Sequence, residues 1–118
     1  MEKQFRYVPK SERVSRGESS SYVIHNYVTR EFSPNVSVGV SHLDGELWYT
    51  QNEVSDRAYY FIEADARVEF ASSEVVNVST GDALFISAGT EYQITGTFTA
   101  VLVNSPAFEV KNERERER

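Results

Sequence analysis

The sequence of 118 residues contains no cysteine, which excludes disulfide bonds, thiolate zinc sites and a cysteine nucleophile. It also lacks an apolar run close to the roughly 18 residues that a membrane span needs, and its N-terminus, MEKQFRYVPK, lacks the apolar core of a secretory signal. A basic surface is missing too: the formal net charge is −6, whereas nucleic acids are bound by an excess of lysine and arginine. We therefore expect a cytoplasmic protein whose partners are neither membranes nor nucleic acids.

Helical periodicity is scarce as well, and apolar and polar residues instead alternate in short segments, as is typical of half-buried β-strands. Within 36–42 valines alternate with serine and glycine, and Asp44-Gly45 then gives a strong signal for a two-residue hairpin turn. Further strands are expected at 46–52, 58–62, 66–70, 74–78, 83–86, 91–95 and 98–104. Short strands at such intervals, in a chain with 40% apolar residues, predict one all-β domain that forms a sandwich or a barrel.

The two ends of the chain differ in composition from its centre. Residues 1–21 end with the small polar stretch RGESSS, and we interpret them as an N-terminal arm and loop. Residues 22–110 contain the predicted strands and form the expected domain. The last residues, 111–118, read KNERERER and include no apolar side chain with which to bury a face. We therefore expect 111–118 to be a charged, disordered tail.

Two stretches of the sequence have the spacing of the two cupin motifs. In the first, five residues separate Gly45 from the segment QNE, and Arg57 follows where that motif has its glutamate. In the second, Gly81 precedes Gly89 at the spacing of that motif's glycines. Over about residues 33–108 the sequence therefore resembles the cupin superfamily. This resemblance implies a single small jelly-roll β-barrel.

The positions at which cupins bind a metal ion differ here from the family pattern. The family has three histidines and a glutamate, and this sequence has Gln51, Glu53, Arg57 and Tyr92 in their places. An arginine side chain keeps its proton, offers no lone pair and repels a divalent cation. We therefore expect Arg57 to form a salt bridge with Glu53, and the barrel to hold neither a metal nor another cofactor.

The resemblance also implies which side chains face the interior of the barrel. If the family's ligand positions point inward, the alternation of side chains along a strand brings their neighbours at two-residue intervals inward too. The predicted lining residues are Tyr49, Gln51, Glu53, Arg57, Tyr59, Phe61, Tyr92 and Ile94. Such a cavity suits a small polar ligand of sugar or nucleoside type. Its candidate ligand-binding residues are Tyr49, Gln51 and Arg57.

Some metal-free cupins epimerise, isomerise or dehydrate sugar-like substrates with acids and bases of these types. The resemblance implies Glu53 as a general base, Tyr59 or Tyr92 as a proton donor, and Arg57 as the group that steers an anion or a carbonyl. The segments AYYFIEADARVEF and NSPAFEV are similar to a metal-free cupin dehydratase that acts on a nucleoside aldehyde. A tyrosine of that enzyme's site would fall on Tyr59, and its histidine would fall on Glu46.

Three functions remain open for such a barrel. It could be an enzyme with acid–base lyase or isomerase chemistry, a protein that binds a small polar ligand without changing it, or a scaffold whose barrel is filled and salt-bridged. An enzyme or a binding protein should have an open polar cavity. A scaffold should have that space filled by Phe61, Tyr49 and their neighbours.

His42 and the outer face of the barrel give two further expectations. His42 continues the inward face of the preceding valines, and hairpin pairing would place it opposite Leu47. It is either structural or, if the pocket opens there, a ligand-binding group that titrates near neutral pH. Trp48, Thr50 and Tyr60 alternate to the outer face, on which cupins commonly pack a second subunit. We therefore expect a homodimer that forms through this outer sheet.

Overall fold

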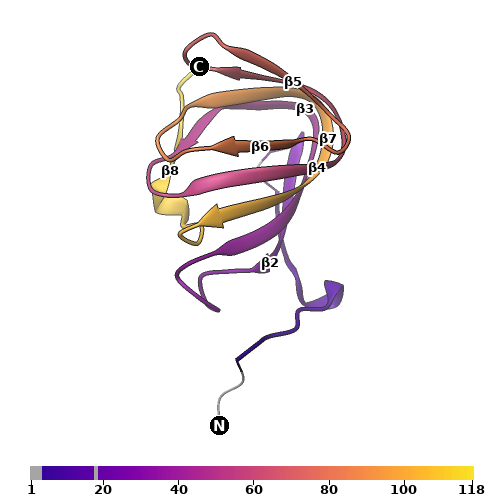
Figure 1. Cartoon of the computed structure of the whole chain (residues 1–118), viewed down its shortest axis with the longest axis vertical. Helices are drawn as coiled ribbons and strands as arrows, with labels where there is room; N and C mark the ends of the chain where they lie inside the picture. The colour runs from indigo at the N-terminus through magenta and orange to yellow at the C-terminus, as the bar shows by residue number, and fades with distance from the viewer. Residues whose placement is uncertain (1–3, 18) are drawn as a thin grey trace.

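The chain is built almost entirely from β-strands. In the computed structural model, which describes residues 4–17 and 19–118, the strands form one antiparallel sheet that curls into a barrel (Figure 1). Its elements are η1 (Lys10–Glu12), β1 (Val14–Gly17), β2 (Tyr22–Val28), β3 (Ser37–Asn52), β4 (Asp56–Phe70), β5 (Val75–Ser79), β6 (Ala83–Ile86), β7 (Tyr92–Ser105), η2 (Val110–Asn112) and β8 (Glu113–Glu115). No helix in the described ranges has the length and apolar character that a membrane span requires. The prediction of an all-β domain is confirmed.

The three longest strands, β3, β4 and β7, form the centre of the sheet, where β7 pairs with β3 on one side and with β4 on the other. The order is β1-β2-β3-β7-β4-β5, while β6 pairs with the first half of β4 and β8 with the end of β3. Gly45 of β3 and Gly96 of β7 lie opposite each other, with φ angles of 132° and 124°. A Cβ atom on Gly96 would lie 2.4 Å from the carbonyl oxygen of Asp65. Only glycine therefore allows β4 and β7 to approach so closely here.

The predicted hairpin at Asp44-Gly45 is wrong, because β3 continues through both residues. They pair with residues 96–97 of β7, in the middle of a long ladder. A hairpin turn would need a positive φ, but Gly45 uses it for a change of direction within one strand. In the same way, the segments 58–62 and 66–70, which were expected as separate strands, both belong to β4.

Large aromatic side chains form the core. Tyr59 stacks on Phe61 with their ring centroids 5.7 Å apart, and Phe98 meets both rings edge-on. Phe61 and Tyr92 have no exposed surface. Burying a side chain of this size stabilises a fold by about 1.5–3 kcal/mol. These residues hold β4 and β7 together at the position from which Tyr59 reaches a cavity.

Both ends of the chain add strands to the sheet. β1, which lies within the predicted arm, pairs with β2, while positions 1–3 and 18 of that arm lie outside the described residues. The expectation of a disordered tail is wrong for residues 113–115. They form β8 and pair with residues 50–52 of β3. Figure 1 shows this C-terminal segment along the side of the barrel and the N-terminal arm leading away from it.

Candidate functional site

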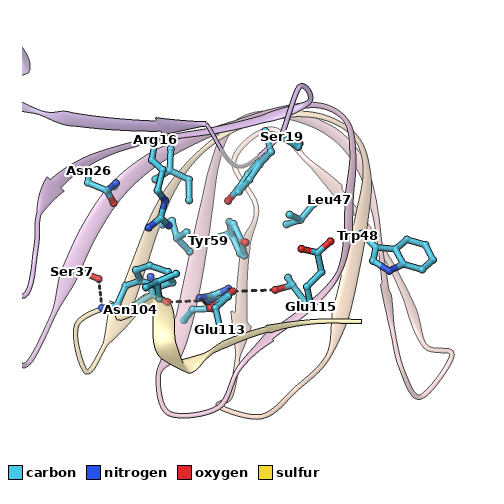
Figure 2. Close-up of a pocket in the computed structure, with 18 of the residues that line it drawn as sticks. Arg16, Ser19, Asn26, Ser37, Leu47, Trp48, Tyr59, Asn104, Glu113 and Glu115 are labelled. Carbon is cyan, nitrogen blue, oxygen red and sulfur yellow. Dashed lines mark hydrogen bonds and ion pairs between the residues drawn. The ribbon is translucent and has the colours of Figure 1, made fainter. Parts of the chain in front are cut away.

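A cavity of about 320 Å³ opens in the barrel beside the aromatic core (Figure 2). The side chains around it come from strands that are distant in the sequence. They include Arg16 of β1, Asn26 of β2, Tyr59 of β4, Asn104 of β7 and Glu113 of β8. The cavity is therefore completed by segments near both ends of the chain, which fold against the central strands.

Arg57 of β4 is the centre of a buried hydrogen-bond network at this cavity. Its side chain is 5% exposed, and Nε donates to Asn104 Oδ1 at 2.9 Å while Nη1 donates to the Tyr92 hydroxyl at 2.9 Å. Nη1 and Nη2 also donate to the two carboxylate oxygens of Glu113, each at 3.0 Å. Burial opposes the charge, but the oxygens of Tyr92, Tyr59 and Glu113 raise the pKa of Arg57 above its ordinary value. Arg57 is therefore a permanent cation inside the barrel.

Glu113 neutralises this cation and has little capacity left for a ligand. Besides the two bonds from Arg57, its carboxylate accepts one from the Asn52 amide at 2.9 Å. The Thr50 hydroxyl has one proton and lies 3.2 Å from both this carboxylate and the Arg114 carbonyl. An ionised carboxylate has about four lone-pair sites, and at least three donors occupy them. The geometry therefore makes Glu113 a fixed counter-ion for Arg57 and a poor acceptor for a proton from a ligand.

Two tyrosine hydroxyls extend the network from Arg57 to the cavity. The hydroxyl oxygens of Tyr92 and Tyr59 lie 2.8 Å apart. Tyr92 accepts a bond from Arg57, and either hydroxyl of the Tyr59–Tyr92 pair can be the donor, so Tyr59 can donate or accept here. Burial, followed by the neighbouring Tyr22 and Tyr92, raises the pKa of Tyr59 well above its ordinary value. Tyr59 is therefore a neutral hydroxyl group on a residue that borders the cavity.

Glu53 lies outside the cavity, and the predicted salt bridge between Arg57 and Glu53 is wrong. The side chain of Glu53 is 48% exposed and pairs with Arg114 at 3.1 Å. Asn52, rather than Glu53, turns inward and bonds to Glu113, which takes the position beside Arg57. This geometry gives no support to Glu53 as a general base.

A β-bulge explains why the predicted inward face of β3 is the wrong one. The register of β3 against β7 shifts between Leu47 and Thr50, and a one-residue shift exchanges the two faces of a strand. Thr50 consequently borders the cavity. Tyr49 points elsewhere and donates from its hydroxyl to Glu69 at 2.6 Å. Neither Tyr49 nor Gln51, both predicted to bind a ligand, is among the residues that line the cavity.

His42 lies on the outer face of β3 and also stays out of the cavity. Its Nδ1 is 3.0 Å from the Thr99 hydroxyl, and its ring meets His25 edge-on at 5.2 Å. The inward face here belongs to the alternate residues, such as the fully buried Ser41. The predicted pairing with Leu47 also fails, because the hairpin does not form and both residues pair with β7.

The C-terminal segment, residues 113–118, supplies the part of the site that sequence reasoning missed. Its charges alternate with the two-residue period of a strand, so that glutamates face the barrel and arginines face acidic residues around it. The ion pairs are Arg57–Glu113, Arg114–Glu53, Arg116–Glu91 and Arg118–Glu46. The guanidinium groups of Arg116 and Arg118 also lie over the rings of Tyr49 and Trp48, 3.7 and 4.4 Å from their centroids. The two-residue alternation of charge in residues 113–118 was the one feature of the sequence that could have indicated a strand here.

The residues at the four metal-ligand positions of the cupin pattern do not converge. Arg57 and Tyr92 hydrogen-bond to each other, whereas Gln51 does not line the cavity and Glu53 is exposed. Within residues 4–17 and 19–118, no three His, Cys, Asp or Glu side chains are grouped so that they could hold a metal ion. These residues therefore do not fit the metal that cupins commonly bind.

No protein-family model and no curated protein matches this sequence, but solved structures are similar to it. Pac13 of Streptomyces, described as a nucleoside dehydratase, has a TM-score of 0.84 at 18% identity, over 97% of this chain and 92% of that one. Variants of Pac13 were solved with uridine. KdgF of Halomonas sp. has a TM-score of 0.76 at 16% identity, over 90% of this chain and 97% of that one.

A third similar structure is the ectoine synthase of P. lautus, with a TM-score of 0.71 at 10% identity, over 85% of this chain and 79% of that one. All three proteins have cupin-type folds. At these identities the likeness concerns the fold. It confirms what the motif spacing predicted: the chain is a single jelly-roll β-barrel with the cupin fold.

Proposed function

We propose that the barrel binds a small polar molecule of sugar or nucleoside type. The observation that carries this proposal is an open cavity of about 320 Å³ that is lined by Tyr59. Its volume lies at the lower end of the range of small-molecule pockets, about 300–1,000 Å³. Phe61 and Tyr49, the residues that would fill the barrel of a scaffold, are not among its lining residues. The uridine bound to variants of Pac13 gives the nucleoside class as the first to test.

In this proposal Tyr59 is the group that contacts the ligand, and Arg57 and Tyr92 position it. A hydroxyl backed by a buried guanidinium can donate to an oxygen on which negative charge develops, as in a carbonyl that becomes an enolate. This arrangement supports acid–base chemistry of the lyase (dehydratase) or isomerase type. Glu53, Tyr49, Gln51 and His42 have no part in the proposal, because they lie outside the cavity.

Binding without chemistry is the second candidate, and the state of Glu113 favours it. The carboxylate nearest to Arg57 already accepts at least three hydrogen bonds, two of them from the guanidinium, and is therefore a poor base. The two candidates differ in the fate of the bound molecule. Mass spectrometry of the ligand after incubation with the protein would show loss of water for a dehydratase, and NMR spectroscopy would show a rearranged ligand of equal mass for an isomerase. A binding protein would leave the ligand unchanged in both measurements.

The experiment that tests the proposal is titration calorimetry with uridine and with simple sugars. The Tyr59→Phe variant should bind about tenfold more weakly than the natural chain, because a net hydrogen bond is worth about 1–1.5 kcal/mol. Tyr60→Phe is the matched control, since Tyr60 is the next residue and is 52% exposed on the outer face. Equal affinity of both variants for the ligand, or no binding by the natural chain, would contradict the proposal.

We also propose that the outer face of the sheet joins two copies of the chain. Phe85 of β6 is 65% exposed, and Tyr60 lies near it on the neighbouring strand β4. Val101 and Val103 of β7 continue the same apolar face. Of the other residues expected at this interface, Thr50 instead borders the cavity near Glu113. Trp48 also lines the cavity and donates to the Arg116 carbonyl at 2.8 Å. Exposed apolar side chains that adjoin one another are a feature of protein–protein interfaces. A monomeric mass in solution would overturn the idea.

A further inference from the structure

Glu115 is a charged residue that lines the cavity but takes no part in the hydrogen-bond network around Arg57 and Tyr59. It lies on β8 two residues after Glu113, so both side chains face the barrel while Arg114 between them faces outward to Glu53. Figure 2 shows the Glu115 carboxylate within the cavity, on the side of Leu47, and the ring of Tyr59 on another wall of the same space. The C-terminal segment thus brings a second carboxylate to the site.

Glu115 is exposed to solvent at the edge of the cavity, and it differs from the other two carboxylates that line the cavity because no residue that the structure describes bonds to its side chain. Glu46 is paired with Arg118, and Glu113 is bonded to Arg57, Thr50 and Asn52. Among residues 4–17 and 19–118, the side chain of Glu115 makes no hydrogen bond or ion pair with another residue. A charged acceptor that is open toward a cavity can bind a donor from a ligand more strongly than a neutral acceptor can.

We infer that Glu115 accepts a hydrogen bond from a hydroxyl group of the ligand while Tyr59 donates one to an oxygen elsewhere on the same molecule. The inference rests on the proposed binding function and narrows its ligand class. Such a ligand is neutral where it meets Glu115, carries a hydroxyl there, and has an acceptor oxygen at its other end. A nucleoside or a sugar meets these requirements. A phosphate or carboxylate placed next to Glu115 would be repelled by its charge.

The test combines a change in the protein with a change in the ligand. Titration calorimetry would compare uridine with 5′-deoxyuridine and with 2′,3′-dideoxyuridine, each added to the natural chain, to Glu115→Gln and to Glu117→Gln. On the natural chain, one of the two analogues should bind about tenfold more weakly than uridine, since a hydrogen bond to a charged group is lost. With Glu115→Gln, removal of the same hydroxyl should weaken binding only about twofold to threefold, because the amide is a weaker acceptor.

Glu117→Gln is the matched control, because it makes the same change in the same segment but Glu117 does not line the cavity. It should keep the tenfold preference for uridine. Unchanged preferences in Glu115→Gln, with its melting temperature equal to that of the natural chain, would overturn the role of Glu115 while uridine binding still supports the proposed function. Failure of the natural chain to bind uridine or any simple sugar would overturn the proposed function and this inference together.

Discussion

The buried network and the C-terminal segment meet at Glu113, yet they are held by opposite means. Arg57, Tyr59 and Tyr92 come from the two central strands, are at most 5% exposed, and bond to one another inside an aromatic core. The segment 113–118 has a short edge strand, and its outward arginines are 41–65% exposed. One wall of the site is therefore fixed by packing, and the other by charges that solvent and salt can reach.

The largest effect should come from removing the cation of the buried network. Arg57→Met leaves Glu113 without its partner and removes donors from Asn104 and Tyr92. Breaking a buried ion pair in this way costs about 3–5 kcal/mol, and the free energy of unfolding should fall by that amount in urea titrations. The variant should also bind ligand poorly, because Tyr59 loses the group that orients its hydroxyl.

Arg67→Met is the control for this prediction, because it removes an arginine of the same strand whose pair with Glu69 is on the surface. Arg67 is 50% exposed and lies 3.1 Å from Glu69. A surface pair of this kind is worth about 0–1 kcal/mol. If both variants lost the same free energy of unfolding, the distinction between the buried network and a surface ion pair would be lost.

The buried network is also the part of the site that the sequence predicted best. The motif spacing singled out Arg57 and Tyr92, and the alternation along the strand added Tyr59. These predictions were possible because in a core strand the fold constrains both the residue type and its position. The prediction was wrong at 49–53, where a single bulge exchanged the faces of the strand. It was wrong at Gly45 as well, because a glycine with a positive φ occurs both in hairpin turns and within a continuous strand, and the sequence does not distinguish the two.

The C-terminal segment could not be predicted from hydrophobicity, because it has none to offer. The segment is held by ion pairs between its arginines and acidic residues that lie much earlier in the sequence. Glu53 and Glu46 precede their partners by 60 positions or more, and Glu91 precedes its partner by 25. Such long-range charge pairing leaves no periodic apolar signal in the segment itself. A strand whose alternating residues are all charged has the same sequence pattern as a solvated tail, so the two can be distinguished only when the residues that pair with it are known.

An intermediate effect should follow from neutralising the outward arginines together, as Arg114, Arg116 and Arg118 changed to glutamine. Each exposed pair is worth about 0–1 kcal/mol, so the loss should be local to the segment. Hydrogen exchange of the Arg116 amide, which donates to the Tyr49 carbonyl, should quicken. About 1 M salt should quicken the same amide in the natural chain by screening these pairs. Amides of β4 and β7 around Tyr59 should keep their protection in both cases.

This prediction contrasts directly with that for Arg57. If the triple variant destabilised the whole chain as much as Arg57→Met, the segment and the network would be one cooperative unit. If salt left the Arg116 amide unchanged, the stacking on Tyr49 and Trp48, rather than the ion pairs, would be what holds the segment.

The smallest effect should come from His25, which belongs to neither region. It lies on the outer side of β2, where its Nδ1 is 2.6 Å from the Ser15 hydroxyl and its ring faces His42. Burial, together with Arg13, His42 and Lys10, lowers the pKa of His25 below 6.5 in the folded chain. The unfolded chain therefore binds the proton more readily, so stability is full above about pH 6.5 and falls as the pH drops below it.

His25→Gln should remove this part of the pH dependence. Between pH 7 and pH 5 the melting temperature of the natural chain should fall further than that of the variant, by a few degrees at most. Ligand affinity and the exchange of the Arg116 amide should respond to pH alike in the two proteins, because His25 touches neither the network nor the segment. A variant that reproduced the natural melting curve at both pH values would show that the acid response arises elsewhere. A change in ligand affinity would show that the outer face and the cavity are coupled through β3.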